Sequence, residues 1–133
     1  MKNYLVALSL LIGSAAAAEK TYDIKIDLSL NKKKISTSRL IVKEGEGGSV
    51  TQDTAAGKSF VEVVAMEGVA ENKKAVMMNF IVGMINENGV RTIVSRPQIL
   101  VAENELAEVI VGDQNNKEVM SMAVVARPAK TAP

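Results

Sequence analysis

Apolar and polar residues alternate with a period of two along most of the chain. The run from Tyr22 to Leu30 is the clearest case, since its apolar residues are separated by Asp23, Lys25, Asp27 and Ser29. Such alternation is typical of a strand with one face on a core and the other in water, and no long stretch shows the 3.6-residue period of a helix. The pattern therefore predicts an all-β protein built from antiparallel strands.

The same alternation, interrupted by polar turns, divides the chain into eight predicted strands. The run from Ala75 to Ile85 is apolar at nearly every position and fits either a buried helix or a central strand covered on both faces. Its β-branched content and the hairpin signal Asn88-Gly89 favour the strand. The polar residues from Gly68 to Lys74 form the longest connection and the midpoint. The predicted strands are 22–30, 35–42, 50–53, 60–66, 75–85, 90–101, 106–111 and 119–126.

The two halves of this series, 21–67 and 75–126, resemble each other. A shift of 59 positions places Ser36–Met66 on Ser95–Val125 without a gap and brings Val50 onto Val109 and Val61 onto Met120. Either the chain contains an internal duplication, or two β-meanders share similar loop lengths. Two four-stranded halves that bury their apolar faces against each other form an antiparallel β-sandwich of about eight strands, which is the fold we expect.

The first eighteen residues have the pattern of an export signal. Lys2 precedes a short apolar run, and the small residues Ser14 to Ala18 fit the cleavage site of a signal peptidase. The alternative is a buried N-terminal helix. We expect a signal peptide over 1–18, a single β-sandwich domain over 19–127, a disordered tail over 128–133, and no transmembrane segment after signal cleavage, since no later run reaches the roughly 20 apolar residues required.

Composition excludes several classes of chemistry. The 16 Lys and Arg nearly cancel the 15 Asp and Glu, so the chain has no basic excess with which to bind nucleic acid. Without Cys and His it has no disulfide, no thiolate nucleophile, no imidazole base and no Cys or His metal ligand. With so few aromatic residues, we expect a core of Val, Ile, Leu, Met and Ala.

Short motifs add no site. Ser29 and Lys32 have the spacing of a serine nucleophile box but lie at the end of a predicted strand, and Gly57-Lys58-Ser59 has no upstream Gly for a phosphate-binding loop. Five methionines could bind copper(I) but fit core packing better: Met77, Met78, Met84, Met120 and Met122. We predict no catalytic residue, no metal ligand and no cofactor.

One segment, Ser95 to Asp113, combines two β-patterned runs with the polar turn Glu103-Asn104-Glu105. Its residues resemble the signature segment of the secretin family, the outer-membrane pore subunits of type II and type III secretion and type IV pilus machines. The resemblance implies a β-hairpin of a related envelope protein, in which the matching residues have structural roles. They include Ser95, Pro97, Asn104, Ala107, Val109 and Gly112.

Pro97 suits a sheet edge or a bulge because it lacks an N–H group, and Asn104 tolerates left-handed backbone at a turn. Ala107 offers a small side chain where facing strands approach closely, and Gly112 ends the second run. These roles are structural rather than chemical.

The sequence therefore predicts an exported, non-enzymatic envelope or periplasmic protein. We expect it to act through protein–protein contact, either with a protein partner in the envelope or by self-association, along an exposed sheet edge. The alternative is a periplasmic binding or inhibitor module that recognises a protein or small ligand through its loops. A free, regular edge strand favours the first function, and a deep pocket with convergent polar groups favours the second.

Overall fold

The computed structural model describes residues 20–54, 57–112, 115 and 117–129, and the strands within them confirm an all-β protein. The expected signal peptide and the last residues of the expected tail lie outside these residues. Pro128, which we assigned to the tail, instead belongs to the last strand. The nine strands are β1 (Thr21–Leu30), β2 (Lys33–Lys43), β3 (Gly47–Thr54), β4 (Gly57–Ala70), β5 (Lys73–Ile85), β6 (Arg91–Ser95), β7 (Gln98–Ala102), β8 (Leu106–Gly112) and β9 (Glu118–Pro128).

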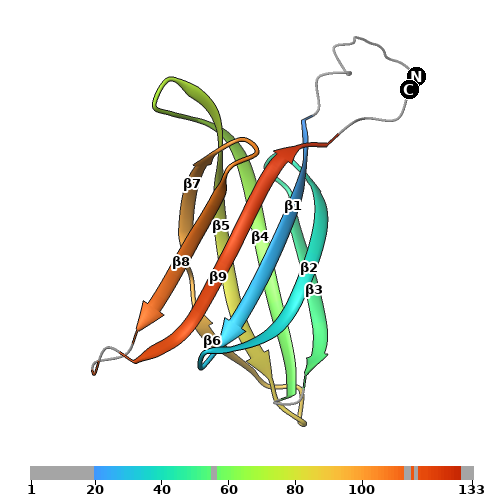
Figure 1. Cartoon of the computed structure of the whole chain (residues 1–133). Coiled ribbons are helices and arrows are strands. Elements are labelled where there is room, and N and C mark those ends of the chain that lie inside the picture. Colours follow the sequence, from blue (N-terminus) through green and yellow to red (C-terminus); the bar gives the residue numbers. More distant parts are fainter. Residues whose placement is uncertain (1–19, 55–56, 113–114, 116, 130–133) are drawn as a thin grey trace, which may run out of the picture.

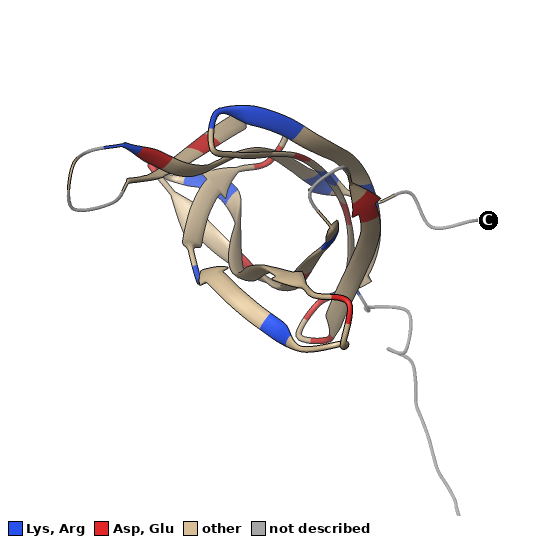
Figure 2. Ribbon diagram, turned by 90° about the horizontal axis from the view of Figure 1, so that it is seen from below, with Lys and Arg blue, Asp and Glu red and all other residues tan. Residues whose placement is uncertain are grey.

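These strands form two antiparallel sheets that pack together as a β-sandwich (Figure 1). Sheet 1 has the order β2-β1-β9-β8. Sheet 2 has the order β3-β4-β5-β6, and β7 pairs with another part of β5. Viewed end-on, the strands surround the core, and charged residues lie around them (Figure 2). No helix in the described ranges is long and apolar enough to cross a membrane.

The core consists of the inward-facing residues of the central strands. Every second side chain of β1, from Tyr22 to Leu28, is buried, and the same holds for β9 from Met120 to Ala126. Most of the core is aliphatic, as expected from the composition, but the largest fully buried side chains are the aromatic Tyr22, Phe60 and Phe80. Of the Met residues considered as copper ligands, Met78, Met120 and Met122 are fully buried among apolar neighbours, while Met77 lies partly exposed on the outer face of sheet 2.

Two connections differ from the prediction. The run 90–101 is divided at Arg96-Pro97 into β6 and β7, because Pro97 has no N–H to donate, and this division gives nine strands instead of eight. The expected long connection at 68–74 is a turn of two residues, Glu71 and Asn72, both at positive φ. Two such residues fit the twist of a hairpin, so β4 and β5 extend to the turn.

The two halves of the chain have equivalent topology. In this comparison β1 corresponds to β5, β2 to β6 and β7 together, β3 to β8, and β4 to β9. The order β2-β1-β9-β8 of sheet 1 then matches the order β7-β5-β4-β3 of sheet 2. Even the irregularities coincide. Leu28 pairs with Ser36 and Val82 pairs with Ser95, and each pair is followed directly by a register shift.

The packing of these halves differs from the expected one. We expected each half to form one sheet, but each half gives two strands to sheet 1 and two or more to sheet 2. The gapless correspondence also slips by two residues in the last strand. Val61 pairs with Val50 and Met122 pairs with Val109, so the equivalent of Val61 is Met122 and not Met120. The cause is the longer connection between β8 and β9.

Candidate functional site

The four outer strands of the sheets differ in how well they are protected against pairing with another chain. β2 carries Lys33, Lys34, Arg39 and Lys43, and the outward residues of β3 are Gly or polar. The edge formed by β6 and β7 is broken at Pro97. Charges, proline and irregularity are the usual devices that keep a sheet edge from adding a further strand. Three of the edges therefore have a recognisable defence.

The fourth edge, β8, has almost none. Its sequence LAEVIVG contains no Lys, Arg or Pro and only one charge, Glu108. The outward side chains of Leu106 and Ile110 are 62% and 67% exposed. Ile41 on the β2 edge is equally exposed at 67%, but it lies between Arg39 and Lys43 on the same face of its strand. In the described part of the chain, β8 forms a ladder with β9 and with no other strand. We call the unpaired side of Leu106–Gly112 the β8 edge.

The β8 edge is free because the chain changes sheets directly before it. Glu103–Glu105 form the turn, with Asn104 at a φ of 69° as expected for a tight turn. The N–H of Glu103 donates to the Lys74 carbonyl of sheet 2 at 3.1 Å, and the N–H of Asn104 donates to the Ala126 carbonyl of sheet 1 at 2.8 Å. The turn is thus fixed to both sheets.

This arrangement corrects the expectation that 95–113 forms a β-hairpin. β7 pairs with β5 and β8 pairs with β9, so the two strands on either side of the turn lie in different sheets. The equivalent turn around Gly45, whose φ is 80°, connects β2 of sheet 1 to β3 of sheet 2 in the same way. A period-two pattern does not distinguish a hairpin from such a crossing, because it defines faces and not partners.

The β8–β9 pair projects from the body of the molecule. Figure 1 shows β8 running away from the other strands toward its C-terminal end, and the end-on view of Figure 2 shows the same pair extending outside the ring of strands. The inward side chains Ala107, Val109 and Val111 are half-buried against the core. The core therefore fixes one face of β8, while its other face and its edge remain accessible.

The segment's predicted residues do not converge on one point. Ser95 pairs with Val82 at the end of β6, and the Pro97 carbonyl accepts a hydrogen bond from the N–H of Phe80 at 2.9 Å. Asn104 forms the turn, Ala107 and Val109 face inward from β8, and Gly112 is its last residue. The residue of the first half that corresponds to Ala107 is Gly48. A Cβ on Gly48 would lie 2.4 Å from the side chain of Val42, so neighbouring strands approach closely at that position.

Sequence reasoning missed Leu106 and Ile110. Periodicity predicts that both lie on the outer face of a strand, but it does not reveal that this strand lies at a sheet edge. One signal was present in the sequence. The run from Leu106 to Gly112 contains a single charge, whereas β2, the opposite edge of sheet 1, has four.

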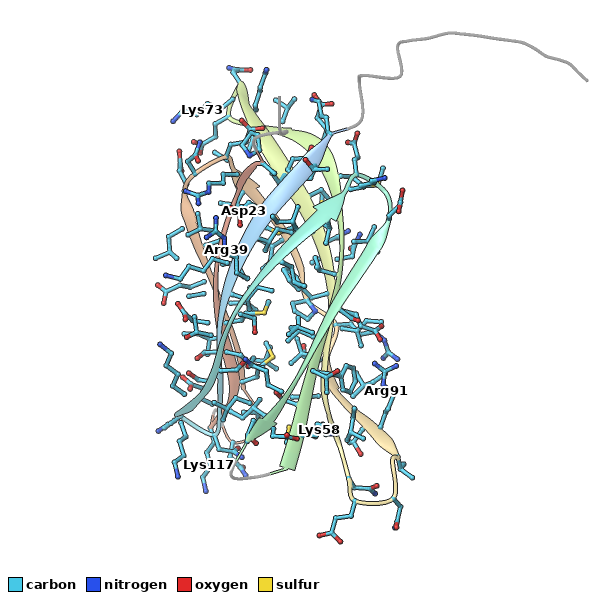
Figure 3. The ribbon with its side chains drawn as sticks, turned by 90° about the vertical axis from the view of Figure 1, so that its right-hand side faces the viewer. Asp23, Arg39, Lys58, Lys73, Arg91 and Lys117 are labelled. Carbon is cyan, nitrogen blue, oxygen red and sulfur yellow. The ribbon has the colours of Figure 1, made fainter. Side chains whose placement is uncertain are left out.

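The outer face of sheet 1 carries an ion cluster formed by Asp23, Arg39 and Arg127. The Asp23 carboxylate is only 9% exposed and accepts a 2.7 Å hydrogen bond from Nε of Arg39 and a 3.2 Å bond from Nη2 of Arg127. The hydrogen bond from Arg39 is the main cause of a lowered pKa at Asp23, against the opposing effect of burial. Figure 3 shows Asp23 and Arg39 next to each other. The cluster thus connects the first, second and last strands.

Open grooves lie on the sheet faces in the described part of the chain. One of about 500 Å³ on sheet 2 includes Glu62, Asn79 and Pro97 in its lining. Glu62 already accepts a hydrogen bond from Arg91, and Asn79 accepts one from Gln98 at 2.9 Å. Two more, of about 520 and 650 Å³, border the Asp23 cluster. Polar side chains that are already hydrogen-bonded to each other contribute less to the binding of a ligand. These grooves are therefore weaker candidates for a functional site than the β8 edge.

The described residues include no group of three or more His, Cys, Asp or Glu that could hold a metal ion. Comparison with known proteins adds no further assignment, because no family model, no curated protein and no solved structure matches the chain.

Proposed function

We propose that this protein is an exported, non-enzymatic protein of the cell envelope that acts through protein–protein contact, with the β8 edge as its binding strand. The observation that carries the proposal is the unprotected edge at Leu106–Gly112. Addition of a strand to such an edge satisfies backbone N–H and C=O groups along its whole length, and side chains then supply specificity. The envelope location rests on the sequence pattern of residues 1–18 and on the secretin-like residues of 95–112.

The alternative of a ligand-binding module receives less support. Its polar groups would have to converge on a pocket, whereas Glu62 and Asn79 in the sheet 2 groove are each occupied by a neighbouring side chain. The β8 edge combines backbone hydrogen-bonding groups with two exposed apolar side chains, Leu106 and Ile110. Removal of such apolar side chains from water on association is favourable, roughly in proportion to the apolar area that is buried.

Site-specific photo-crosslinking tests the proposal. A photoreactive residue at Glu108, which points outward from the centre of β8, should form a crosslinked product when the protein is made in its own cells. Ser49 is the matched control, because it occupies the equivalent outward position on the β3 edge. Products from position 108 but not from position 49 support the β8 edge. No product from position 108, or equal products from both, would refute it.

The export proposal has a separate test. The protein should be recovered from the envelope or periplasmic fraction with a mature N-terminus near Glu19, as read by mass spectrometry of the intact chain. An uncleaved chain that still begins at Met1 would contradict it.

A further inference from the structure

We infer that the partner of the β8 edge is a second copy of this chain, paired antiparallel about a twofold axis at Val109. This inference rests on the proposed function and names the partner of the same edge. The joined sheet would have the order β2-β1-β9-β8 followed by β8-β9-β1-β2 of the second copy. β8 has 7 residues, so the new ladder would be about 24 Å long.

The position of Glu108 selects this register. A twofold axis at Val109 pairs all of Leu106–Gly112 and places each Glu108 opposite Ile110 of the second copy. An axis at Glu108 would place two carboxylates directly opposite each other, and like charges in that position are destabilising. An axis at Ile110 avoids that contact but leaves Leu106 and Ala107 without partners. The register at Val109 is therefore the longest one without opposed charges.

The surroundings of β8 also suit a second copy. The cross-strand neighbours of Leu106, Glu108 and Ile110 on β9 are Val125, Ala123 and Ser121, none of them charged, whereas Gly112 at the end of the strand lies opposite Glu118. The formal net charge of the whole chain is only +1, so two copies repel each other weakly. A strip whose only charges are Glu108 and Glu118 can thus meet the same strip on the other copy.

The protected edges limit the assembly to a dimer. A twofold contact uses the β8 edge of both copies, and the edges that remain are those of β2, β3 and β6–β7. These carry Lys and Arg, polar residues or the break at Pro97. A self-complementary contact of this kind closes on itself and does not propagate into a filament.

Mass measurement over a concentration series is the first test. The purified protein should approach twice its chain mass in sedimentation equilibrium. Ile110→Glu should raise the dissociation constant at least about tenfold, since it places a second carboxylate opposite Glu108 in both cross-strand pairs. Thr51→Glu, at the equivalent position of β3, is the control and should leave the mass unchanged. Leu106→Lys repeats the test at a second exposed side chain. A wild-type protein that is monomeric throughout the series overturns the inference.

Introduced cysteines test the register, since the chain has no Cys of its own. Val109→Cys should form a disulfide-linked dimer on mild oxidation. Glu108→Cys and Ile110→Cys should form few dimers alone and many when the two variants are mixed, because each residue faces the other across the axis. Efficient dimers from Glu108→Cys alone would place the axis elsewhere and overturn the register.

The crosslinked products from position 108 distinguish this inference from the proposed function. A product of twice the chain mass supports a second copy. A product of any other mass, from a protein that is monomeric in sedimentation, overturns the second copy but retains the β8 edge as a contact site. Absence of any product from position 108 refutes both.

Discussion

Asp23, near the start of the first strand, accepts a 3.2 Å hydrogen bond from Arg127, near the end of the last strand. Arg39 binds the same carboxylate from the other side, so three strands that are distant in sequence meet at one buried charge. Two guanidinium groups balance one carboxylate that has little contact with water. Loss of that carboxylate, or of its charge, should therefore affect stability as well as local structure.

The first prediction concerns pH. The pKa of Asp23 is lowered in the folded protein, chiefly by the hydrogen bond from Arg39, so the unfolded chain binds a proton more readily than the native one. The charged carboxylate therefore makes its full contribution to the free energy of unfolding when the pH is above the ordinary pKa of 3.8. That contribution is lost as the pH falls through the lower pKa of the folded protein. Asp23→Asn should cost about 1.5 kcal/mol at pH 7, a typical value for hydrogen bonds to a charged group, and progressively less in acid.

Urea unfolding at several pH values measures this difference. Asp53→Asn is the control, because the Asp53 side chain is 89% exposed and its change should have little effect at any pH. A destabilisation by Asp23→Asn that stays constant from neutral pH to below 3 would contradict the linkage to its ionisation.

The period-two pattern of the sequence predicts which side chains of a strand are buried, but not which strands are neighbours in a sheet. Alternation from Tyr22 to Leu30 correctly indicates which side chains of β1 are buried, since the period of two reflects the pleat itself. It does not state which strand lies next to which. The alternation on both sides of Asn104 therefore predicts a hairpin, although this turn connects two sheets.

The candidate site was harder to predict for the same reason. Leu106 and Ile110 lie on the outer face of sheet 1 at a strand with no further neighbour, and the lack of a strand beyond β8 is a property of the whole topology. Asp23, Arg39 and Arg127 are separated by as many as 104 positions in the chain, and only the pairing of β1 with both β2 and β9 brings them together. Local pattern contains neither relationship.

A second prediction concerns Gly83, which lies beside the ring of Phe60. That ring is on the outer face of sheet 2 yet buried, with the guanidinium of Arg91 3.9 Å from its centroid. A Cβ on Gly83 would lie 2.2 Å from the Thr92 carbonyl oxygen and 2.7 Å from the ring. Since neither the backbone nor the enclosed ring can move freely, Gly83→Ala should destabilise the protein by about 2 kcal/mol or more.

Thermal or urea unfolding of Gly83→Ala measures the cost. Gly47→Ala serves as the control, because a Cβ there would meet Val64 at an ordinary 3.8 Å in extended backbone. If both variants unfold at the same denaturant concentration as the parent, the close packing at Phe60 is not as described.

A third prediction uses the equivalent turns at Gly45 and Asn104. Both residues have positive φ, and a Cβ on Gly45 would meet no atom within 4 Å, so any effect of substitution there comes from the backbone alone. Gly45→Ala should cost about 1–2 kcal/mol, and Gly45→Asn less, because Asn adopts left-handed backbone more readily. The converse change, Asn104→Gly, should be close to neutral. Equal costs for Ala and Asn at position 45 would contradict this assignment.

The last prediction follows from the equivalence of the two halves. β4 and β5 are joined by the two-residue turn Glu71-Asn72, while their counterparts β9 and β1 pair without a connection. The N–H of Ala129 donates to the Thr21 carbonyl at 2.9 Å, so the two ends already lie side by side. A short Asn-Gly linker from Ala129 to Lys20, with new termini between Glu71 and Asn72, should therefore fold with a stability within about 2 kcal/mol of the parent.

Circular dichroism and urea unfolding of this permutant test the idea. A second permutant, with the same linker but new termini between Met78 and Asn79, is the matched control. It interrupts β5 where that strand pairs with both β4 and β7, so it should fail to fold cooperatively. Failure of both permutants would mean that the β4–β5 turn has a role that the β9–β1 junction cannot assume, and the two halves would then be alike in topology but not in their contribution to folding.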